Sequence, residues 1–387
     1  MSHHFDVLVI GGGVAGLSVA WRAARRGSRV AVADPDPGSG ASHAAAGMLA
    51  PVSEVTYTEE PLLRLGLASL SRWPAFAADL TEDGGLDLDY RALGTLDVAF
   101  GSDDLAALDE LAAFVDKLGL PAERLTGREC RRLEPMLAPS VRGGLLAGGD
   151  SWVDPRRVVK ALLTALQRRG GALVRSRVAG LTTDAAEKVT GVRLASGETI
   201  GADLVVLAAG AWSGGLEGLP SDAVPPVRPV KGQIMRLRSA TPILGRCVRG
   251  VVHGSPVYLV PRGDGEVVVG ATQEEMGFDT RVTAGGLWEL LRDARELVPG
   301  VTELQVHDVV AGLRPGTPDN LPLVGPSAAA GLSLATGHHR GGVLLAPLTA
   351  DLLFPPSSSE ARSPGVPPGE EDELRAICSP LRFQEHR

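Results

Sequence analysis

The sequence predicts an α/β protein with two domains: a discontinuous, doubly wound nucleotide-binding domain and an α+β domain with an antiparallel sheet. Two observations support this prediction. A glycine-rich turn links an apolar strand to a helix near the N-terminus, and strand-like segments crowd the range from about residue 220 to 282. A chain of 387 residues is long enough to form two domains, each with its own core.

The N-terminal strand–turn–helix unit carries the strongest local signal. Residues 5–10 read FDVLVI, an apolar and β-branched run typical of a buried parallel strand. Gly11, Gly13 and Gly16 follow in the order GxGxxG, and a second strand ends at Asp34. In this pattern the glycines make the tight turn, admit a pyrophosphate to the backbone and let the helix pack on the strand. The acid accepts hydrogen bonds from ribose. The alternative is a glycine-rich turn that binds nothing, but strand, glycines, helix and acid all in register favour a Rossmann-like dinucleotide site.

The number of fingerprints bears on which dinucleotide is bound. A flavoprotein that uses NAD(P)H as its reductant usually needs a second GxGxxG turn. Residues 205–215, VVLAAGAWSGG, have glycines after a strand but not in that order. One nucleotide site therefore indicates a flavin that the substrate reduces directly.

Composition excludes several classes of protein. The formal net charge is −8, which argues against a nucleic-acid-binding surface. The sequence has no apolar run of roughly 18 residues, as a membrane span needs, and the first strand starts by Phe5, which leaves no room for a signal peptide. Cys130, Cys247 and Cys378 are far apart, so neither a disulfide framework nor a zinc site is expected. We therefore expect a soluble cytoplasmic protein without a metal site or stable membrane association.

Other segments complete the predicted domains. Helices are expected from Ser102 to Gly119, after the capping pair Asp154-Pro155, and at about 284–298. Residues 229–239 form a strand, and the turn Gly263-Asp264-Gly265 joins a hairpin. The predicted nucleotide domain spans 1–85, 145–219 and 305–354, and the second domain spans 86–144 and 220–304. Residues 355–387 form a tail whose first part, 355–373, is of low complexity, and we expect the tail to be disordered.

Several motifs then occur in one characteristic order: VIGGGVAGLS (9–18), AAAGMLAP (44–51), LAAGAWS (207–213), VYLVPR and VVVGAT (257–272), GLRPGTPDNLPLVG (312–325) and GHHRGGVLLAP (337–347). In these motifs the chain resembles the flavin-dependent D-amino-acid oxidase family over residues 5 to about 353. AAAGML points to its glycine oxidase branch, the type that serves thiamine biosynthesis. Asp34 departs from many relatives, which have glutamate there, and Gln273 departs from some, which carry an apolar residue.

The resemblance implies the site. Arg314 falls on the arginine that binds the substrate carboxylate, a task suited to a planar guanidinium. It stands on the strand-like run VVAGLR (309–314), before rigid Pro/Gly turns. The other implied substrate-binding residues are Arg340, Tyr258 and Met48. His338 and His339 are interpreted as placing backbone against the flavin, and a helix is expected to start at Gly341-Gly342. The implied FAD-binding residues are Gly11, Gly13, Val14, Ala15, Gly16, Asp34, Pro35, Ala41, Ser42, Ala46, Gly47, Met48, Val178, Gly210, His338, His339, Arg340, Gly341, Gly342, Val343 and Leu344.

The resemblance further implies non-covalent FAD and the oxidation of glycine by O2 to glyoxylate, ammonia and hydrogen peroxide. The implied mechanism needs few catalytic side chains, and no residue is assigned as one, because the cofactor carries the chemistry. Alternatives stay open: a sarcosine or D-amino-acid oxidase, a dehydrogenase that passes electrons to a quinone, or a flavin-binding protein without turnover. Two partners stay open as well. One is a second copy of the chain in a homo-oligomer, and the other is thiazole synthase, which would receive the imine.

Overall fold

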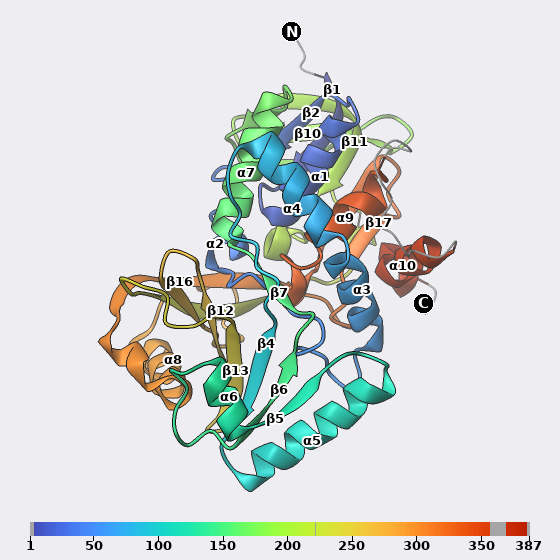
Figure 1. Ribbon diagram of the computed structural model, residues 1–387. Coiled ribbons are helices and arrows are strands. Elements are labelled where there is room, and N and C mark those ends of the chain that lie inside the picture. Colours follow the sequence, from blue (N-terminus) through green and yellow to red (C-terminus); the bar gives the residue numbers. More distant parts are fainter. Residues whose placement is uncertain (1–3, 221, 357–368, 385–387) are drawn as a thin grey trace.

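The computed structural model describes residues 4–220, 222–356 and 369–384, and they form two bodies that meet along a waist (Figure 1). The first body contains an eight-stranded sheet in the order β17-β18-β11-β1-β2-β8; off this path, β10 pairs with β11 and β9 pairs with β10. These strands are β1 (His4–Ile10), β2 (Val30–Ala33), β8 (Ala172–Val174), β9 (Val178–Thr183), β10 (Val189–Leu194), β11 (Thr199–Leu207), β17 (Leu323–Pro326) and β18 (Leu332–Thr336). Strand β1 lies parallel to both β2 and β11, as a doubly wound fold requires.

Helices cover this sheet. Helices α1 (Val14–Arg25), α4 (Trp73–Gly84), α7 (Pro155–Arg168) and α9 (Ala346–Leu353) pack on one another beside it. Helix α7 starts as expected, because the Asp154 carboxylate accepts hydrogen bonds from the N–H groups of Arg156 (2.8 Å) and Arg157 (3.4 Å). Trp21, Trp73 and Phe76 fill the core between the helices with edge-to-face ring contacts.

The second body contains an eight-stranded, mostly antiparallel sheet in the order β16-β12-β15-β14-β13-β4-β6-β5. Its strands are β4 (Thr95–Ala99), β5 (Glu123–Thr126), β6 (Gly143–Ala147), β12 (Arg228–Arg238), β13 (Cys247–Val252), β14 (Ser255–Pro261), β15 (Glu266–Gly270) and β16 (Gln305–Gly316). Helix α8 (Ala284–Leu297) packs against β12, β13, β14 and β15, and α5 (Ser102–Lys117) and α6 (Gly127–Leu133) pack beside β5 and β6. The predicted hairpin and the helix at about 284–298 are thus confirmed, and the predicted helix at 102 ends at Lys117.

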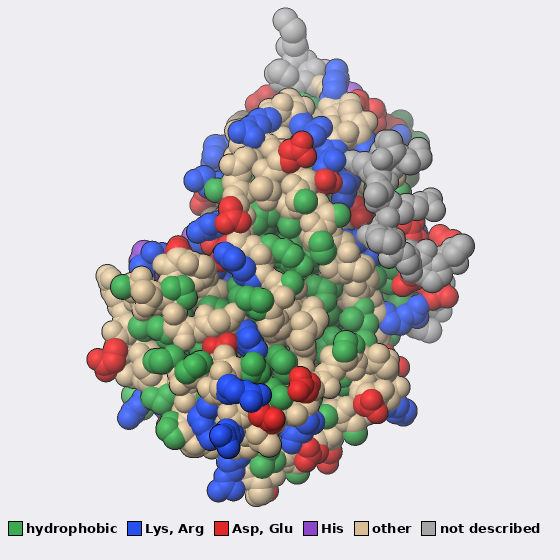
Figure 2. All heavy atoms as spheres, viewed as in Figure 1, with side chains coloured by type: hydrophobic (Ala, Val, Ile, Leu, Met, Phe, Trp, Pro, Cys, Tyr) green, Lys and Arg blue, Asp and Glu red, His purple; other side chains and the backbone are tan. Residues whose placement is uncertain are grey.

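Short elements connect the two bodies. They are α2 (Ala41–Ala44), β3 (Met48–Leu49), which pairs with β7 (Ser151–Trp152), α3 (Glu60–Leu70), and the 3-10 turns η1 (Gly210–Trp212) and η3 (His339–Gly341). The 3-10 turn η2 (Pro299–Glu303) follows α8 within the second body. Acidic and basic side chains are interspersed over the face seen in Figure 2.

Three expectations need correction. Residues 305–316 were expected in the nucleotide domain, but as β16 they pair with β12 from Arg228 to Arg238, and residue 145 falls inside β6 of the same sheet. Strand patterning shows which residues are strands but not which sheet they join. The helix expected at Gly341-Gly342 starts only at Ala346, because the 3-10 turn η3 precedes it.

The third correction concerns the C-terminal segment. The expected disorder of 357–368 lies outside the described residues, but 370–378 form helix α10 (Glu370–Cys378), followed by the 3-10 turn η4 (Pro380–Phe383). Leu374 and Cys378 are buried in the core of the first body. The charged composition of this segment suggested disorder, but the helix also has an apolar stripe with Leu374 and Cys378, which packs against the first body.

Candidate functional site

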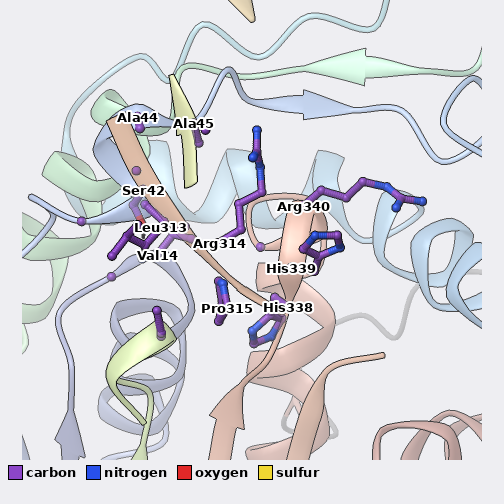
Figure 3. Close-up of a pocket in the computed structure, with 18 of the residues that line it drawn as sticks. Val14, Ser42, Ala44, Ala45, Leu313, Arg314, Pro315, His338, His339 and Arg340 are labelled. Atoms are coloured by element: carbon purple, nitrogen blue, oxygen red, sulfur yellow. Dashed lines mark hydrogen bonds between the residues drawn. The ribbon is translucent and has the colours of Figure 1, made fainter. Parts of the chain in front are cut away.

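A large cavity of about 2220 Å³ lies between the two bodies. Ordinary ligand pockets measure roughly 300–1,000 Å³, so this cavity has room for a dinucleotide and a small substrate. One wall comes from the turn after β1, from α2, β3 and η1, and the other from β12, β14, β16 and α8. Figure 3 shows residues of both walls converging on it.

The glycines of the first turn take the places that their predicted roles require. Gly11 has a φ of 111°, and a Cβ there would collide with the Ala208 carbonyl. A Cβ on Gly16 would collide with the Gly11 carbonyl, so this glycine serves helix–strand packing and does not line the cavity. A Cβ on Gly13 would meet only Ser42 Oγ, at 3.4 Å, so the backbone there is open to a ligand.

Two polar side chains frame this turn. Ser42 Oγ accepts a hydrogen bond from the Val14 N–H (2.9 Å) at the start of α1. The Asp34 carboxylate accepts hydrogen bonds from the N–H groups of Gly12 (2.6 Å) and Asp36 (2.8 Å). A carboxylate oxygen can accept more than one hydrogen bond, so Asp34 keeps acceptor capacity for the hydroxyls of a ribose. The N–H groups at the start of α1 and the open backbone at Gly13 fit the pyrophosphate of FAD, and the Asp34 carboxylate fits a ribose.

The AAAGML segment is fixed by buried arginines. Arg262 donates a hydrogen bond to the Ala46 carbonyl, and Arg236 donates one to the Ala45 carbonyl (3.3 Å). Both side chains are almost fully buried, and Arg236 also pairs with Glu266 at 2.5 Å. Only the VPR motif, which contains Arg262, pointed to one of these supports; no motif pointed to Arg236.

Arg314 lies at the end of β16 that enters the cavity. Its Nη1 donates to the carbonyls of Thr272 (3.2 Å) and Lys231 (3.4 Å). The guanidinium lies directly over Gly232 of β12, where any Cβ would collide with it. Among the described residues no carboxylate forms an ion pair with Arg314, so a full positive charge faces the cavity.

Tyr258 of β14 lies next to Arg314. Gly270 on the neighbouring strand leaves the space that the phenol occupies. Burial raises the pKa of Tyr258 to about 12, although the positive charge of Arg314 works against that rise. The phenol is therefore neutral at physiological pH and can donate a hydrogen bond.

Arg340 behaves differently from Arg314. Its Nη2 forms an ion pair with Glu59, which also accepts hydrogen bonds from Thr56 Oγ1 (2.6 Å) and Asn320 Nδ2 (2.8 Å). Burial alone would raise the pKa of Glu59, but the hydrogen bonds from Thr56, Arg340 and Asn320 outweigh it and lower the pKa. Arg340 lines the cavity, yet Figure 3 shows its side chain turned away from Arg314. Its contact with substrate stays a prediction.

The two histidines before Arg340 are neutral. Burial lowers the pKa of His338 to about 4, and its Nε2 lies 2.8 Å from Thr349 Oγ1. Burial, together with the charge of Arg340, lowers the pKa of His339 to about 4 as well. Neutral rings, buried at His338 and half-buried at His339, suit the interpretation that these residues place backbone.

Most of the residues predicted for the site do come together. The predicted residues that line the cavity are Gly11, Gly13, Val14, Ala15, Asp34, Pro35, Ala41, Ser42, Ala46, Gly47, Met48, Val178, Gly210, Tyr258, Arg314, His338, His339, Arg340, Gly342 and Val343. Gly16, Gly341 and Leu344 do not line it; Gly341 and Leu344 line a small neighbouring pocket instead. Their individual roles toward a ligand stay predictions.

Sequence reasoning missed other residues that line the cavity, notably Glu54, Arg249 and Gln233. Arg249 stands directly opposite Tyr258 in the β13–β14 pairing. Directly paired residues on neighbouring strands share a face of the sheet. Had the pairing of β13 with β14 been known, Arg249 could therefore have been predicted to lie beside Tyr258. None of Cys130, Cys247 and Cys378 lines the cavity, and all three are buried.

The described residues lack two features that would indicate other functions. No cluster of three or more His, Cys, Asp or Glu side chains is arranged to hold a metal ion there. No helix within the described ranges is long and apolar enough to cross a membrane.

Comparisons with known proteins agree with this geometry. A family model described as "FAD dependent oxidoreductase" matches residues 6–354. Glycine oxidase of Geobacillus kaustophilus is 35% identical over 91% of this chain and 93% of its own length. A crystal structure of glycine oxidase from that organism superposes with a TM-score of 0.86 at 33% identity, covering 98% of this chain and 99% of the other. The bifunctional protein ThiO/ThiG of Trichormus variabilis is 35% identical over 90% of this chain, which spans 52% of that protein.

Proposed function

The chain belongs to the family of FAD-dependent oxidoreductases, and from that premise we propose that it is an oxidase of glycine. The products are glyoxylate, ammonia and hydrogen peroxide, with O2 as the electron acceptor. The observation that carries the proposal is Arg314, an arginine without a carboxylate partner among the described residues, held over Gly232 in a cavity large enough for FAD.

The residues of the first body fit the cofactor. The open backbone at Gly13 and the first-turn N–H groups of α1 would hold its pyrophosphate, and the Asp34 carboxylate would accept hydrogen bonds from a ribose. Bound FAD supplies an acceptor for two electrons, which O2 then reoxidises. No cysteine lines the cavity, which supports a non-covalent cofactor.

Arg314 and Tyr258 form the substrate site. A guanidinium binds a carboxylate by two parallel hydrogen bonds, and the neutral phenol of Tyr258 donates a third. The carbonyls of Thr272 and Lys231 fix the guanidinium before a ligand arrives. Glycine has no side chain, so its carboxylate and amine must supply nearly all of its binding energy. Holding the carboxylate orients Cα in the cavity.

The product imine is proposed to enter thiazole synthesis. This part of the proposal is supported by the bifunctional ThiO/ThiG protein, in which the region that matches this chain is joined to a further half. Two experiments test the hand-off to thiazole synthase. The two proteins should co-purify, and less glyoxylate should be released into solution when thiazole synthase is present.

A substrate panel with peroxide detection tests the main proposal. Glycine, sarcosine, D-alanine, D-proline and L-proline are compared at equal concentration under air. Glycine should give the highest kcat/KM, with peroxide and glyoxylate in equal amounts. If a D-amino acid is turned over faster than glycine, that amino acid is the substrate instead. If the protein reduces a quinone but not O2, it is a dehydrogenase.

A further inference from the structure

A second pocket, much smaller than the large cavity, lies against it. Its volume is about 30 Å³. It shares four lining residues with the cavity: Glu54, Val55, Thr56 and Arg340. The others come from the connection before α3, from α3 itself, and from η3 and the chain that links it to α9: Pro51, Glu59, Leu62, Leu63, Gly66, Gly341, Leu344 and Leu345. The small pocket therefore borders the large cavity without overlapping the substrate site at Arg314 and Tyr258.

One stretch of backbone, residues 340–345, takes part in both spaces. Gly342 and Val343 line the large cavity. Gly341, Leu344 and Leu345 line the small pocket instead. A molecule held in the pocket is thus separated from the cavity only by this stretch and by the residues that both spaces share.

The pocket offers little to a polar ligand. Most of its lining is hydrocarbon, and the polar groups at its edge bond to other protein groups. Glu59 accepts a hydrogen bond from Thr56 Oγ1 (2.6 Å), and the Leu344 carbonyl accepts hydrogen bonds from Ser69 Oγ (2.6 Å) and Trp73 Nε1 (2.9 Å). Within the part of the chain that the structure describes, no lining residue has a buried side-chain nitrogen or oxygen without a partner. A buried water needs about two to four polar partners, so this pocket suits an apolar molecule better than water.

Two absent side chains leave this space open. A Cβ on Gly66 would lie 2.8 Å from Pro51 Cβ and 3.4 Å from Leu344 Cδ2, and a Cβ on Gly341 would lie 3.2 Å from Leu345 Cδ1. Gly66 stands in the middle of α3, although glycine is one of the poorest residues for a helix interior. One water-sized sphere needs roughly 10–15 Å³ of such volume, so the pocket holds about one diatomic molecule and no amino acid.

We propose that this small pocket binds O2 and supplies it to the reduced cofactor. The inference rests on the proposed function, in which O2 is the electron acceptor. O2 is apolar and diatomic, so it matches both the lining and the volume of the pocket. O2 accepts two electrons and two protons from the reduced cofactor and becomes hydrogen peroxide, which is polar and leaves through the larger cavity. Substrate and oxidant then have separate places, the substrate at Arg314 and O2 behind residues 341–345.

Xenon tests the pocket without any turnover. Crystals of the FAD-loaded protein are pressurised with xenon, an apolar gas that binds in dry cavities. Xenon should occupy the pocket in the wild-type protein. Leu62→Phe, which adds ring atoms to the lining, should exclude it, and Leu62→Ala should retain it. An ordered water in the pocket, or a pocket without xenon in the wild-type protein, would overturn the proposal.

Rapid mixing tests the supply of O2. The bound FAD is photoreduced without substrate and mixed with O2, and the return of the oxidised flavin absorbance is followed. Leu62→Phe should lower the second-order rate constant by about 10-fold, while anaerobic reduction of FAD by glycine changes by less than about 2-fold. Leu67→Phe is the matched control, because Leu67 is also a half-buried leucine of α3 but lines neither space. An unchanged rate constant in Leu62→Phe, or an equal loss in Leu67→Phe, contradicts the inference.

A variant of opposite size guards against a general loss of structure. Leu62→Ala enlarges the pocket, so its rate constant with O2 should equal or exceed that of the wild-type protein. A fall in both Leu62 variants would mean that Leu62 acts on packing alone, which rejects the inference. Because photoreduction needs no amine, the two proposals fail separately. If glycine does not reduce FAD but the xenon and O2 results hold, the proposed substrate is wrong and the O2 pocket stands. If photoreduced protein reacts with O2 no faster than free reduced FAD, the O2 pocket is rejected.

Discussion

Arg314 and Arg340 stand at two edges of the same cavity and differ in what holds them. Arg314 is held by backbone carbonyls of Thr272 and Lys231, which fix its position without cancelling its charge. Arg340 is held by the carboxylate of Glu59, which cancels most of its charge. Sequence motifs identified both arginines equally well, but only their tertiary partners decide which of them can bind an anion.

The largest expected effect is at Arg314. Arg314→Ala should raise the KM for glycine by about 30- to 4,000-fold, equal to roughly 2–5 kcal/mol, because one partner of a charge-assisted pair in a dry site is lost. The FAD absorbance spectrum should stay unchanged. Arg314→Lys should recover only part of the loss, because lysine offers a point charge where the carboxylate needs a fork. A near-wild-type KM in the alanine variant would make Arg314 structural.

The loop between the two arginines is tied to the C-terminal segment. Arg382 binds both oxygens of Asp319 (2.7 and 2.9 Å) and the carbonyls of Leu321 and Pro322. Arg382→Ala should therefore lower the free energy of unfolding by about 1–2 kcal/mol, measured by denaturant titration. Arg64→Ala is the control, since it removes an exposed ion pair to Glu373 and should cost less than about 0.5 kcal/mol. Equal stability of the two variants would show that the segment does not hold the loop.

Tyr258→Phe tests the neighbour of Arg314. Removing the phenol should raise the KM for glycine by about 2- to 10-fold, the usual range for one hydrogen bond. The effect should be the same at pH 7 and pH 9, because the pKa of Tyr258 is raised to about 12 and the phenol is protonated at both. Steady-state kinetics at the two pH values would check this, and a loss that disappears at pH 9 would argue against a donated hydrogen bond.

The smallest effect is expected at Arg340. Arg340→Gln should raise the KM for glycine by no more than about 5-fold, because its ion pair with Glu59 is partly exposed and separate from Arg314. Glu59→Gln frees the guanidinium and should leave KM equal or lower. The comparison of the two arginines fails if Arg340→Gln costs as much as Arg314→Ala, which would mean that Arg340 leaves Glu59 to bind substrate.

Local chemistry made part of this structure predictable. The glycine turn before α1, the Asp154 cap of α7 and the strand that carries Arg314 each depend on residues close in sequence. The sheet that receives β16 and the burial of Leu374 depend on partners far along the chain, so the sequence pattern could not reveal them. Arg249 was missed for the same reason, because its relation to Tyr258 exists only once β13 and β14 are paired.

The absence of a side chain at Gly232 has a consequence for the entropy of binding. Arginine has several rotatable bonds, and ordering a long side chain at an interface costs about 0.5–1.5 kcal/mol. Because the bare backbone of Gly232 lets the guanidinium settle against the carbonyls of Lys231 and Thr272, that ordering is complete when the protein folds. A substrate as small as glycine, which has few contacts to offset such a cost, then meets a preorganised partner.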